Sequence, residues 1–227
     1  MFGKLYVVAT PIGNLDDLSY RAEYTLKSVS IIAAEDTRTS KKLLNNFNIN
    51  TKLVAYHNHN EIQQSKSIVK ILKNGDSVAL ISDAGTPCIS DPGYRVVNLA
   101  LRERINVVAI PGPCSLTAAL SISGLPTDRF FFEGFLPPKK GRKTRFELFQ
   151  SLPATIVIFE SPHRIIRTLN DIYNHLGDRV VSVCRELTKM YEEVLLCSIS
   201  DAINHFTFKK VKGELIILIA KDGYSLD

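Results

Sequence analysis

The sequence predicts an α/β protein of two domains, and three observations support that prediction. Short apolar runs alternate with segments of helical spacing up to residue 110. Pro111-Gly112-Pro113 then breaks the alternation, as a domain junction would. Beyond it, neighbouring apolar runs follow one another without a helical segment between them, which favours a mixed or antiparallel sheet. Because 227 residues suffice for two domains, we expect them at 1–112 and 113–227, with a ligand cleft between them.

The predicted strands of the first domain are short apolar runs at 5–9, 30–34, 52–56, 78–81 and 106–110. They are apolar enough to be buried on both faces, which is typical of a parallel sheet with helices on both sides. Helical spacing predicts the intervening helices at 19–29, around Leu43, Leu44 and Phe47, at 61–72 and at 94–103. Asp91 is expected to cap the last helix, with Pro92 in its first position.

Each of these strands ends in a polar or turn-forming loop, and in chain order the loops read TPIGN, EDTR, HNHNE, SDAGTP and PGPCS. Such loops meet at one edge of a parallel sheet, where open α/β proteins bind ligands. The fourth loop offers the Asp83 carboxylate, the hydroxyls of Ser82 and Thr86, and a close backbone approach at Gly85. This pattern suits a polar small molecule, and an ordinary strand-to-helix turn fits it equally well.

The second domain has fewer predicted helices than strands. The strands are expected at 130–134, 155–160, 180–184, 193–197 and 215–220. The helices are expected at 116–122, 164–176 and 199–206, and a loop at 137–145. Strands without helices between them predict a mixed or antiparallel sheet here.

Several reaction classes lose support from missing motifs. The 12 glycines never fall two residues apart, so there is no G-x-G dinucleotide fingerprint, and no P-loop, H-E-x-x-H or G-x-S-x-G motif occurs. His57 and His59 could share one face, but without a convincing third ligand we expect no metal. Four scattered cysteines, with no C-x-x-C pair, are expected to be reduced thiols in a cytoplasmic protein, and no apolar run is long enough to span a membrane.

The charge balance directs attention to one basic segment. The chain carries a formal net charge of +5, which mildly favours a polyanionic partner. Five cations fall within seven residues, at Lys139, Lys140, Arg142, Lys143 and Arg145. Phe135 and Phe146 flank them, and phosphate contacts beside stacking side chains are typical of RNA binding. A solvated surface remains the alternative.

Taken together, the motifs and their order resemble one family. The motifs are TPIGNL at 10–15, AEDTR at 34–38, SDAGTP at 82–87, DPG at 91–93, PGP at 111–113, FEGFLP at 132–137, FESPHR at 159–164, RELTK at 185–189 and KGE at 212–214. They resemble the ribosomal RNA small subunit methyltransferase I family, a branch of the tetrapyrrole methylase (class III methyltransferase) superfamily. The resemblance covers nearly the whole chain and implies that superfamily's two-domain fold.

The resemblance also implies a reaction and its partners. S-adenosylmethionine would be the methyl donor, without a metal, and the acceptor would be the ribose 2′-oxygen of a cytidine in the decoding region of 16S rRNA in the small ribosomal subunit. A homodimer is implied as well. Carried over position by position, the donor site would comprise Pro11, Asp83, Gly85, Thr86, Cys114, Ser115, Leu116, Phe159, Glu160, Leu187, Gly213 and Glu214.

A 2′-hydroxyl is a poor nucleophile at neutral pH, so a base or a stabilising cation would assist the reaction. The leading candidates are Glu35, Asp36, Arg38 and Lys189, with Glu160, His163 and Glu186 behind them. Ion pairs that only hold loops remain the alternative for all of these. Two other functions stay open: a tetrapyrrole methylase of cobalamin synthesis, which EDTR, FEGFLP and the basic segment disfavour, and a non-catalytic RNA-binding assembly protein.

Overall fold

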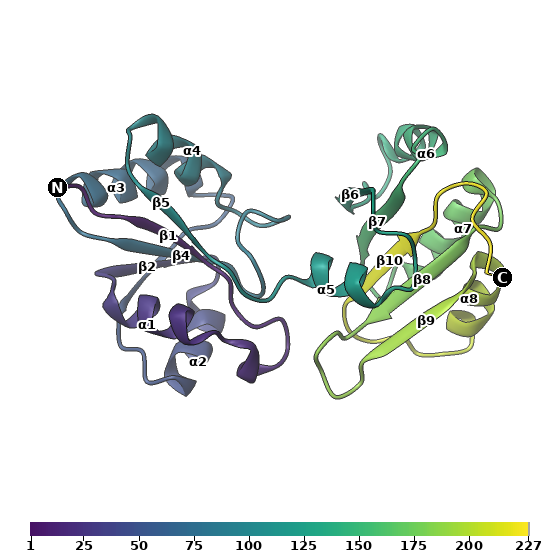
Figure 1. Ribbon diagram of the computed structural model, residues 1–227, viewed down its shortest axis with the longest axis horizontal. Coiled ribbons are helices and arrows are strands. Elements are labelled where there is room, and N and C mark those ends of the chain that lie inside the picture. Colours follow the sequence, from purple (N-terminus) through teal and green to yellow (C-terminus); the bar gives the residue numbers. More distant parts are fainter. Residues whose placement is uncertain (227) are drawn as a thin grey trace. The chain divides into compact units, whose positions relative to one another are not determined.

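The computed structural model describes residues 1–226, so residue 227, the end of the second predicted domain, lies outside the described residues. The chain divides into two compact units, a first unit Met1–Cys114 and a second unit that begins at Ser115 (Figure 1). The division lies two residues beyond the expected boundary at residue 112. Each unit has its own sheet and its own hydrophobic core.

The first unit contains a parallel sheet, as predicted. Its strands are β1 (Leu5–Val8), β2 (Ile31–Ala34), β3 (Lys52–Ala55), β4 (Val78–Ile81) and β5 (Val107–Ile110). Their order in the sheet is β3-β2-β4-β1-β5, and every pair is parallel. All four residues of β4 are buried, which agrees with a strand covered on both faces.

Helices cover both faces of this sheet (Figure 1). The helices are α1 (Tyr20–Ser28), α2 (Thr37–Asn46), α3 (Glu61–Lys73) and α4 (Tyr94–Arg102), and a short 3₁₀ helix η1 (Leu15–Asp17) precedes α1. Leu26 of α1 and Leu44 of α2 share one core cluster with Ile81 of β4. Leu72 of α3 and Val96 of α4 share another, on the opposite face.

This arrangement fixes where a ligand site belongs. β1 and β4 are neighbours in the sheet, but the helix after β1 covers one face and the helix after β4 covers the other. The chain therefore leaves these two strands in opposite directions, which is the topological switch point where open α/β sheets bind ligands. The loops at Thr10 and Asp83 follow these two strands directly.

The start of α4 differs from the prediction. The helix begins at Tyr94 behind Gly93, and no side-chain cap is present, so Asp91 is not the capping residue. The carboxylate of Asp91 interacts with the hydroxyl of Ser82 instead. Gly93 has φ of 150°, and a Cβ there would collide with the Cys88 sulfur. The chain thus packs back on the preceding loop before the helix begins.

The second unit contains a mixed sheet, also as predicted. Its strands are β6 (Phe130–Phe135), β7 (Thr155–Glu160), β8 (Val180–Arg185), β9 (Glu193–Ser198) and β10 (Leu215–Ile219). The order is β6-β7-β10-β8-β9. β6 and β7 are parallel, and the other pairs are antiparallel.

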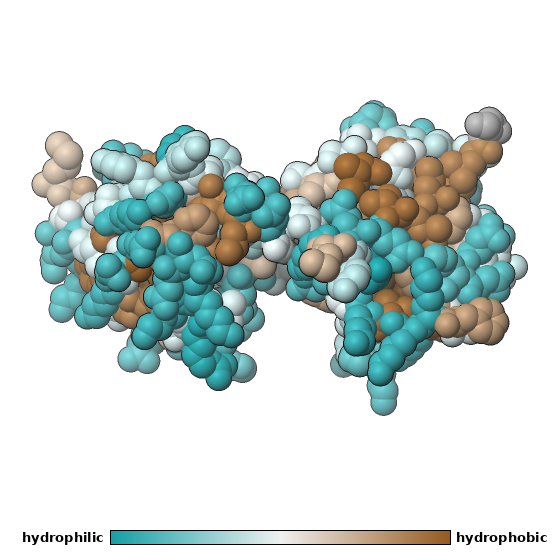
Figure 2. All heavy atoms as spheres, turned by 90° about the horizontal axis from the view of Figure 1, so that it is seen from below, coloured by the Kyte–Doolittle hydropathy of each residue, from teal (hydrophilic) through white to brown (hydrophobic). Residues whose placement is uncertain are grey.

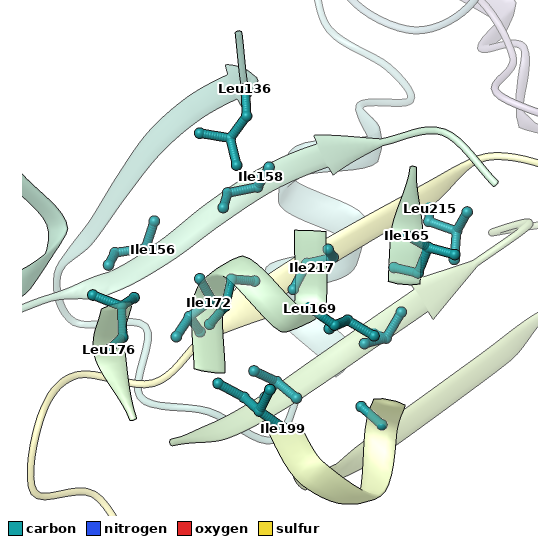
Figure 3. Close-up of a cluster of buried hydrophobic side chains, with 14 of the residues drawn as sticks. Leu136, Ile156, Ile158, Ile165, Leu169, Ile172, Leu176, Ile199, Leu215 and Ile217 are labelled. Atoms are coloured by element: carbon teal, nitrogen blue, oxygen red, sulfur yellow. The ribbon is translucent and has the colours of Figure 1, made fainter. Parts of the chain in front are cut away.

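The core of the second unit lies between the sheet and the last three of its helices. The helices are α5 (Ser115–Ile122), α6 (Arg142–Gln150), α7 (Ile165–Leu176) and α8 (Ile199–Thr207). Figure 3 shows side chains from α7, α8 and the strands meeting in one cluster, with Leu169 of α7 beside Ile217 of β10. Phe146 and Phe149 of α6 belong to the same cluster.

α6 corrects the prediction of a loop at 137–145. The helix starts at Arg142, behind Gly141 in a left-handed conformation. Phe146 and Phe149 are three residues apart and fully buried, which anchors one face of the helix to the core. The basic residues before Phe146 concealed this spacing, because the segment resembles a charged loop.

On the face drawn in Figure 2, hydrophilic residues cover most of the surface, and hydrophobic residues appear in patches on both units. None of the helices within residues 1–226 is long and apolar enough to cross a membrane.

Candidate functional site

The loop that follows β4 is hydrogen-bonded to three neighbouring loops, which follow β1, β2 and β5. Thr10, after β1, exchanges two backbone hydrogen bonds of 2.9 Å with Gly85. The Asp83 carboxylate accepts a 3.0 Å hydrogen bond from the Asp36 amide, which follows β2. The Thr86 hydroxyl donates at 3.0 Å to the Pro113 carbonyl, which follows β5. The loop 83–86 therefore joins the carboxyl ends of four strands, at the switch point of the sheet.

The backbone of this region is held in uncommon conformations. Gly85 has φ of 78°, and a Cβ there would lie 3.2 Å from the Cγ2 atom of Ile12. Cys88 and Ser90 also have positive φ, at 72° and 65°. Such conformations cost free energy for residues with a Cβ and gather at functional sites. Glycine at position 85 avoids both the backbone cost and the close contact with Ile12.

Three carboxylates gather at this loop, and partial desolvation, even of the exposed Asp83, raises the pKa of each. For Glu35, the negative charges of Asp91 and Asp83 raise the pKa further, against a hydrogen bond from the Asp83 amide. Burial is also the largest cause of the raised pKa values of Asp83 and Asp91. Asp91 was not among the expected site residues, and its position after the Gly-Thr-Pro turn is the one signal of it in the sequence. A carboxylate with a raised pKa can accept a proton during a reaction.

Asp36 plays a different part from Glu35. Its side chain caps α2 and accepts two hydrogen bonds from the Arg38 guanidinium, at 3.1 and 2.8 Å. The hydrogen bonds from Arg38 lower the pKa of Asp36 to about 2. A carboxylate that holds its charge so strongly is a poor base, so the Asp36–Arg38 pair is suited to orienting a group and Glu35 to accepting a proton.

In the second unit, ion pairs organise a loop cluster after β8. The Lys189 ammonium donates to Glu186 at 2.8 Å and to Glu214 at 3.0 Å. Glu186 also accepts a hydrogen bond from the Glu214 amide, and a Cβ at Gly213 would collide with the Glu186 side chain. Burial lowers the pKa of Lys189, but the hydrogen bonds to Glu186 and Glu214 outweigh it and raise the pKa. Lys189 is thus suited to act as a cation and unsuited to act as a base.

Leu187 lies inside this cluster and is buried, between two residues of positive φ, Glu186 and Thr188. The structure therefore brings together four of the residues that were expected to bind the donor or act in catalysis: Leu187, Lys189, Gly213 and Glu214. Phe159, also expected there, contacts Phe132 and Phe135 edge to face, with ring centroids 4.9 and 5.7 Å apart.

Glu160 and Arg142 belong to a buried network. The two carboxylate oxygens of Glu160 accept hydrogen bonds from the Ser161 amide at 2.8 Å and the Thr168 hydroxyl at 2.6 Å. Arg142 donates to the Thr168 hydroxyl at 2.8 Å and to Asp171 at 2.7 Å. Only 7% of the Arg142 side chain is exposed. Both side chains are thus engaged in holding α6 and α7 to β7, and neither faces solvent for a ligand or RNA.

The remaining expected residues lie in ordinary positions. Pro11 and Leu116 are buried, and Cys114 and Ser115 are half-buried at the end of the first unit and the start of α5. Of the basic segment, Lys139, Lys140, Lys143 and Arg145 are exposed, and Arg145 pairs with Glu133 at 3.0 Å. His163 is exposed.

His57 and His59 stack edge to face, with ring centroids 5.9 Å apart. Within residues 1–226, no three His, Cys, Asp or Glu side chains are arranged to hold a metal ion.

Comparison with known proteins identifies the family. Residues 4–203 match the family described as Tetrapyrrole (Corrin/Porphyrin) Methylases. A protein of Halalkalibacterium halodurans, named ribosomal RNA small subunit methyltransferase I, is 49% identical over 99% of this chain and 78% of its own length. A protein of the same name from Thermotoga maritima is 45% identical over 96% of this chain and 98% of its own length.

Solved structures agree on the fold. A diphthine synthase superposes with a TM-score of 0.76 at 14% identity, covering 96% of this chain and 90% of that one. A cobalt precorrin-4 methyltransferase superposes with a TM-score of 0.70 at 16% identity, covering 96% and 94%. At these identities the likeness concerns the fold alone. The family match and the near-full-length relatives go further: the chain is a methyltransferase that belongs to the tetrapyrrole methylase family, in the branch named ribosomal RNA small subunit methyltransferase I.

Proposed function

We propose that the protein transfers a methyl group from S-adenosylmethionine to the ribose 2′-oxygen of a cytidine in the decoding region of 16S rRNA, in the cytoplasm and as a homodimer. The names of the near-full-length relatives support small-subunit rRNA as the substrate. The observation that carries the donor site is the loop 83–86, bonded to three neighbouring loops at the switch point of the sheet.

The residues of this loop fit the donor chemically. The exposed Asp83 carboxylate has one oxygen on the Asp36 amide and retains acceptor capacity for hydroxyl or ammonium groups of a ligand. The glycine at position 85 allows the positive φ with which the loop pairs to Thr10 and presents Asp83. From the second unit we propose Leu187, Gly213 and Glu214, whose positions are fixed by Glu186 and Lys189.

When bound, the donor supplies an activated sulfonium methyl group, so alignment accounts for most of the catalytic task. We assign proton acceptance from the 2′-hydroxyl to Glu35, because burial and neighbouring carboxylates raise its pKa. Asp36 and Arg38 would orient the ribose, and Lys189 would stabilise negative charge on the oxygen.

The exposed cations of the basic segment are proposed to contact rRNA phosphates. Lys139, Lys140 and Lys143 are suited to this role, whereas the buried Arg142 is not. A test of RNA contact should therefore replace the three lysines with glutamine and leave Arg142 in place.

The deciding experiment is methyl transfer in vitro. Small ribosomal subunits and naked 16S rRNA from a strain that lacks this enzyme are incubated with the protein and deuterium-labelled S-adenosylmethionine, and the modified nucleotide is mapped by mass spectrometry. We expect one labelled 2′-O-methylcytidine. Donor binding by calorimetry without any labelled RNA would contradict the rRNA substrate and favour a tetrapyrrole acceptor. RNA binding without donor binding would favour a non-catalytic assembly protein.

A further inference from the structure

A cavity in the second unit is lined by none of the residues of the basic segment. It has a volume of about 430 Å³ and lies where the β8–β9 hairpin meets the segment that follows α8. Its lining includes Arg185, Tyr191, Glu193, Lys209, Lys210 and Lys212. We call it the hairpin pocket. Its cations are spread over 28 positions of the chain, so no local run of charge marks the pocket in the sequence.

The hairpin pocket carries an excess of positive charge. Four cations line it, against one carboxylate, Glu193. That carboxylate is already occupied, since it pairs with Arg185 at 2.9 Å and with Lys209 and His205 at 3.0 and 2.8 Å. Lys210 and Lys212 are exposed, and within the described residues neither side chain pairs with an acid. Two cations are thus left to meet an anion.

An exposed aromatic side chain borders the same cavity. Tyr191 lies in the loop between β8 and β9 and is 70% exposed. Phe206 and Val211 add an apolar part to the lining. Cations that contact phosphate and an aromatic ring on which a base stacks are the usual combination for single-stranded RNA.

The chain also links this pocket to the loop cluster proposed to meet the donor. Arg185 directly precedes Glu186, and Lys212 directly precedes Gly213. The Arg185 guanidinium donates to the Lys212 carbonyl at 3.3 Å, so the two segments are bonded together inside the pocket. A nucleotide in the pocket would thus contact both segments that continue into that cluster.

We propose that the hairpin pocket binds the backbone of single-stranded RNA, with phosphate at Lys210 and Lys212 and a base stacked on Tyr191. The proposal rests on rRNA as the substrate of the enzyme. It adds a second RNA-binding surface that is separate in sequence from Lys139, Lys140 and Lys143.

The test measures binding of a fluorescent single-stranded 12-mer RNA to the full chain by anisotropy, over a range of salt concentrations. The pocket variant is Lys210→Gln with Lys212→Gln. The matched control is Arg129→Gln with Lys221→Gln, which removes two exposed cations elsewhere in the same unit. We expect a rise in Kd of about tenfold for the pocket variant, and a decrease in the salt slope of about 0.7 for each phosphate that the variant no longer neutralises. The control should change Kd less than twofold.

Tyr191→Leu separates stacking from charge. We expect it to raise Kd about tenfold while the salt slope stays unchanged, because it removes a ring and no charge. S-adenosylmethionine binding by calorimetry should remain within twofold in all these variants, which shows that they fold. Equal Kd values for the pocket variant and the control would overturn the proposal. If the unaltered protein binds donor but no RNA at all, the rRNA substrate itself fails, which is a different result.

Discussion

The two loop clusters, one in each unit, are held together by different interactions. In the first unit, backbone hydrogen bonds between Thr10 and Gly85 fix the loop, and the carboxylates of Glu35 and Asp83 keep raised pKa values. In the second unit, the Lys189 ammonium bridges Glu186 and Glu214, so side-chain charges fix the loop. The backbone bridge in the first cluster does not depend on the proposed ligand group Asp83, whereas in the second cluster the proposed ligand residue Glu214 itself takes part in the ion pairs. Four experiments compare the two units.

The largest effect on donor binding is expected from Asp83→Ala. The change removes a proposed ligand acceptor but leaves the Thr10–Gly85 bridge, so we expect S-adenosylmethionine affinity to fall about a hundredfold. Stability should change by no more than about 1 kcal/mol, because the side chain is exposed. Calorimetry and urea denaturation measure the two quantities. The control is Glu103→Ala, at the end of α4 away from the site, where Glu103 pairs with Lys73. A large loss of stability in Asp83→Ala would show that a side chain, and not the backbone bridge, holds the first cluster together.

Glu160→Ala, unlike Asp83→Ala, is expected to reduce stability strongly. Its side chain is fully buried, and its loss leaves Thr168 and Arg164 without their carboxylate. We expect the second unit to lose about 3–5 kcal/mol of stability. Hydrogen exchange of β7 and β10 peptides reports this unit directly. Glu147→Ala removes an exposed acid from the same unit and should cost less than about 0.5 kcal/mol. Similar exchange in both variants would show that the buried network contributes little.

Two glycines of the second unit separate backbone strain from collision. Gly213 and Gly141 both have positive φ, at 88° and 83°, but an added Cβ would strike Glu186 at Gly213 and touch nothing within 4 Å at Gly141. Alanine at either position should cost about 1 kcal/mol through the backbone. We expect Gly213→Ala to cost about 1–2 kcal/mol more, because Glu186 must leave Lys189. Urea denaturation of both variants measures the difference. Equal costs would mean that Glu186 moves aside freely.

The smallest effect is expected from pH, and its sign differs between the units. Burial and neighbouring carboxylates raise the pKa of Glu35 in the folded state, so its contribution to stability falls as pH rises from 4.5 through the raised value. Burial alone would raise the pKa of Glu193. Hydrogen bonds from Lys209, Arg185 and His205 outweigh burial and lower this pKa to about 2. Its contribution is present above pH 4.5 and is lost as pH falls toward 2.

Hydrogen exchange of each unit, corrected for intrinsic rates at each pH, measures both trends. Glu35→Gln should make the stability of the first unit less dependent on pH. Glu193→Gln should do the same for the second unit. Parallel trends in the two units would contradict the opposite directions of the pKa shifts of Glu35 and Glu193.

The sequence was sufficient where local pattern decides structure. Apolar runs located the ten strands within residues 1–226, both the fully buried β4 and β10 and the partly exposed β3 and β9. Prediction from the sequence was wrong where contacts with residues outside the local segment determine the structure. The first turn of α6 fell within the loop predicted at 137–145, because the residues that hold Arg142, Thr168 and Asp171, lie 26 and 29 positions away. The prediction that Asp91 caps α4 was wrong because the Asp91 carboxylate interacts with the Ser82 hydroxyl instead.

The candidate site was predictable in part. The SDAGTP loop was located by its glycine and carboxylate, and its bonds to Thr10, Asp36 and Pro113 follow from strand order, which the sequence does not state. The different parts played by Glu35 and Asp36, which are neighbours in the chain, depend on burial and on the Arg38 side chain. No residue pattern distinguishes two adjacent acids in this way.

The place of β10 in its sheet has a consequence for synthesis on the ribosome. β10 lies between β7 and β8, although it is the last strand along the described chain. During translation, the first unit can complete its sheet while the second is still being made. The second sheet cannot close until residues 215–219 have emerged, and until then the facing edges of β7 and β8 stay open to other strands. A nascent chain that stalls before Leu215 is therefore exposed to chaperones and to aggregation in its second unit alone.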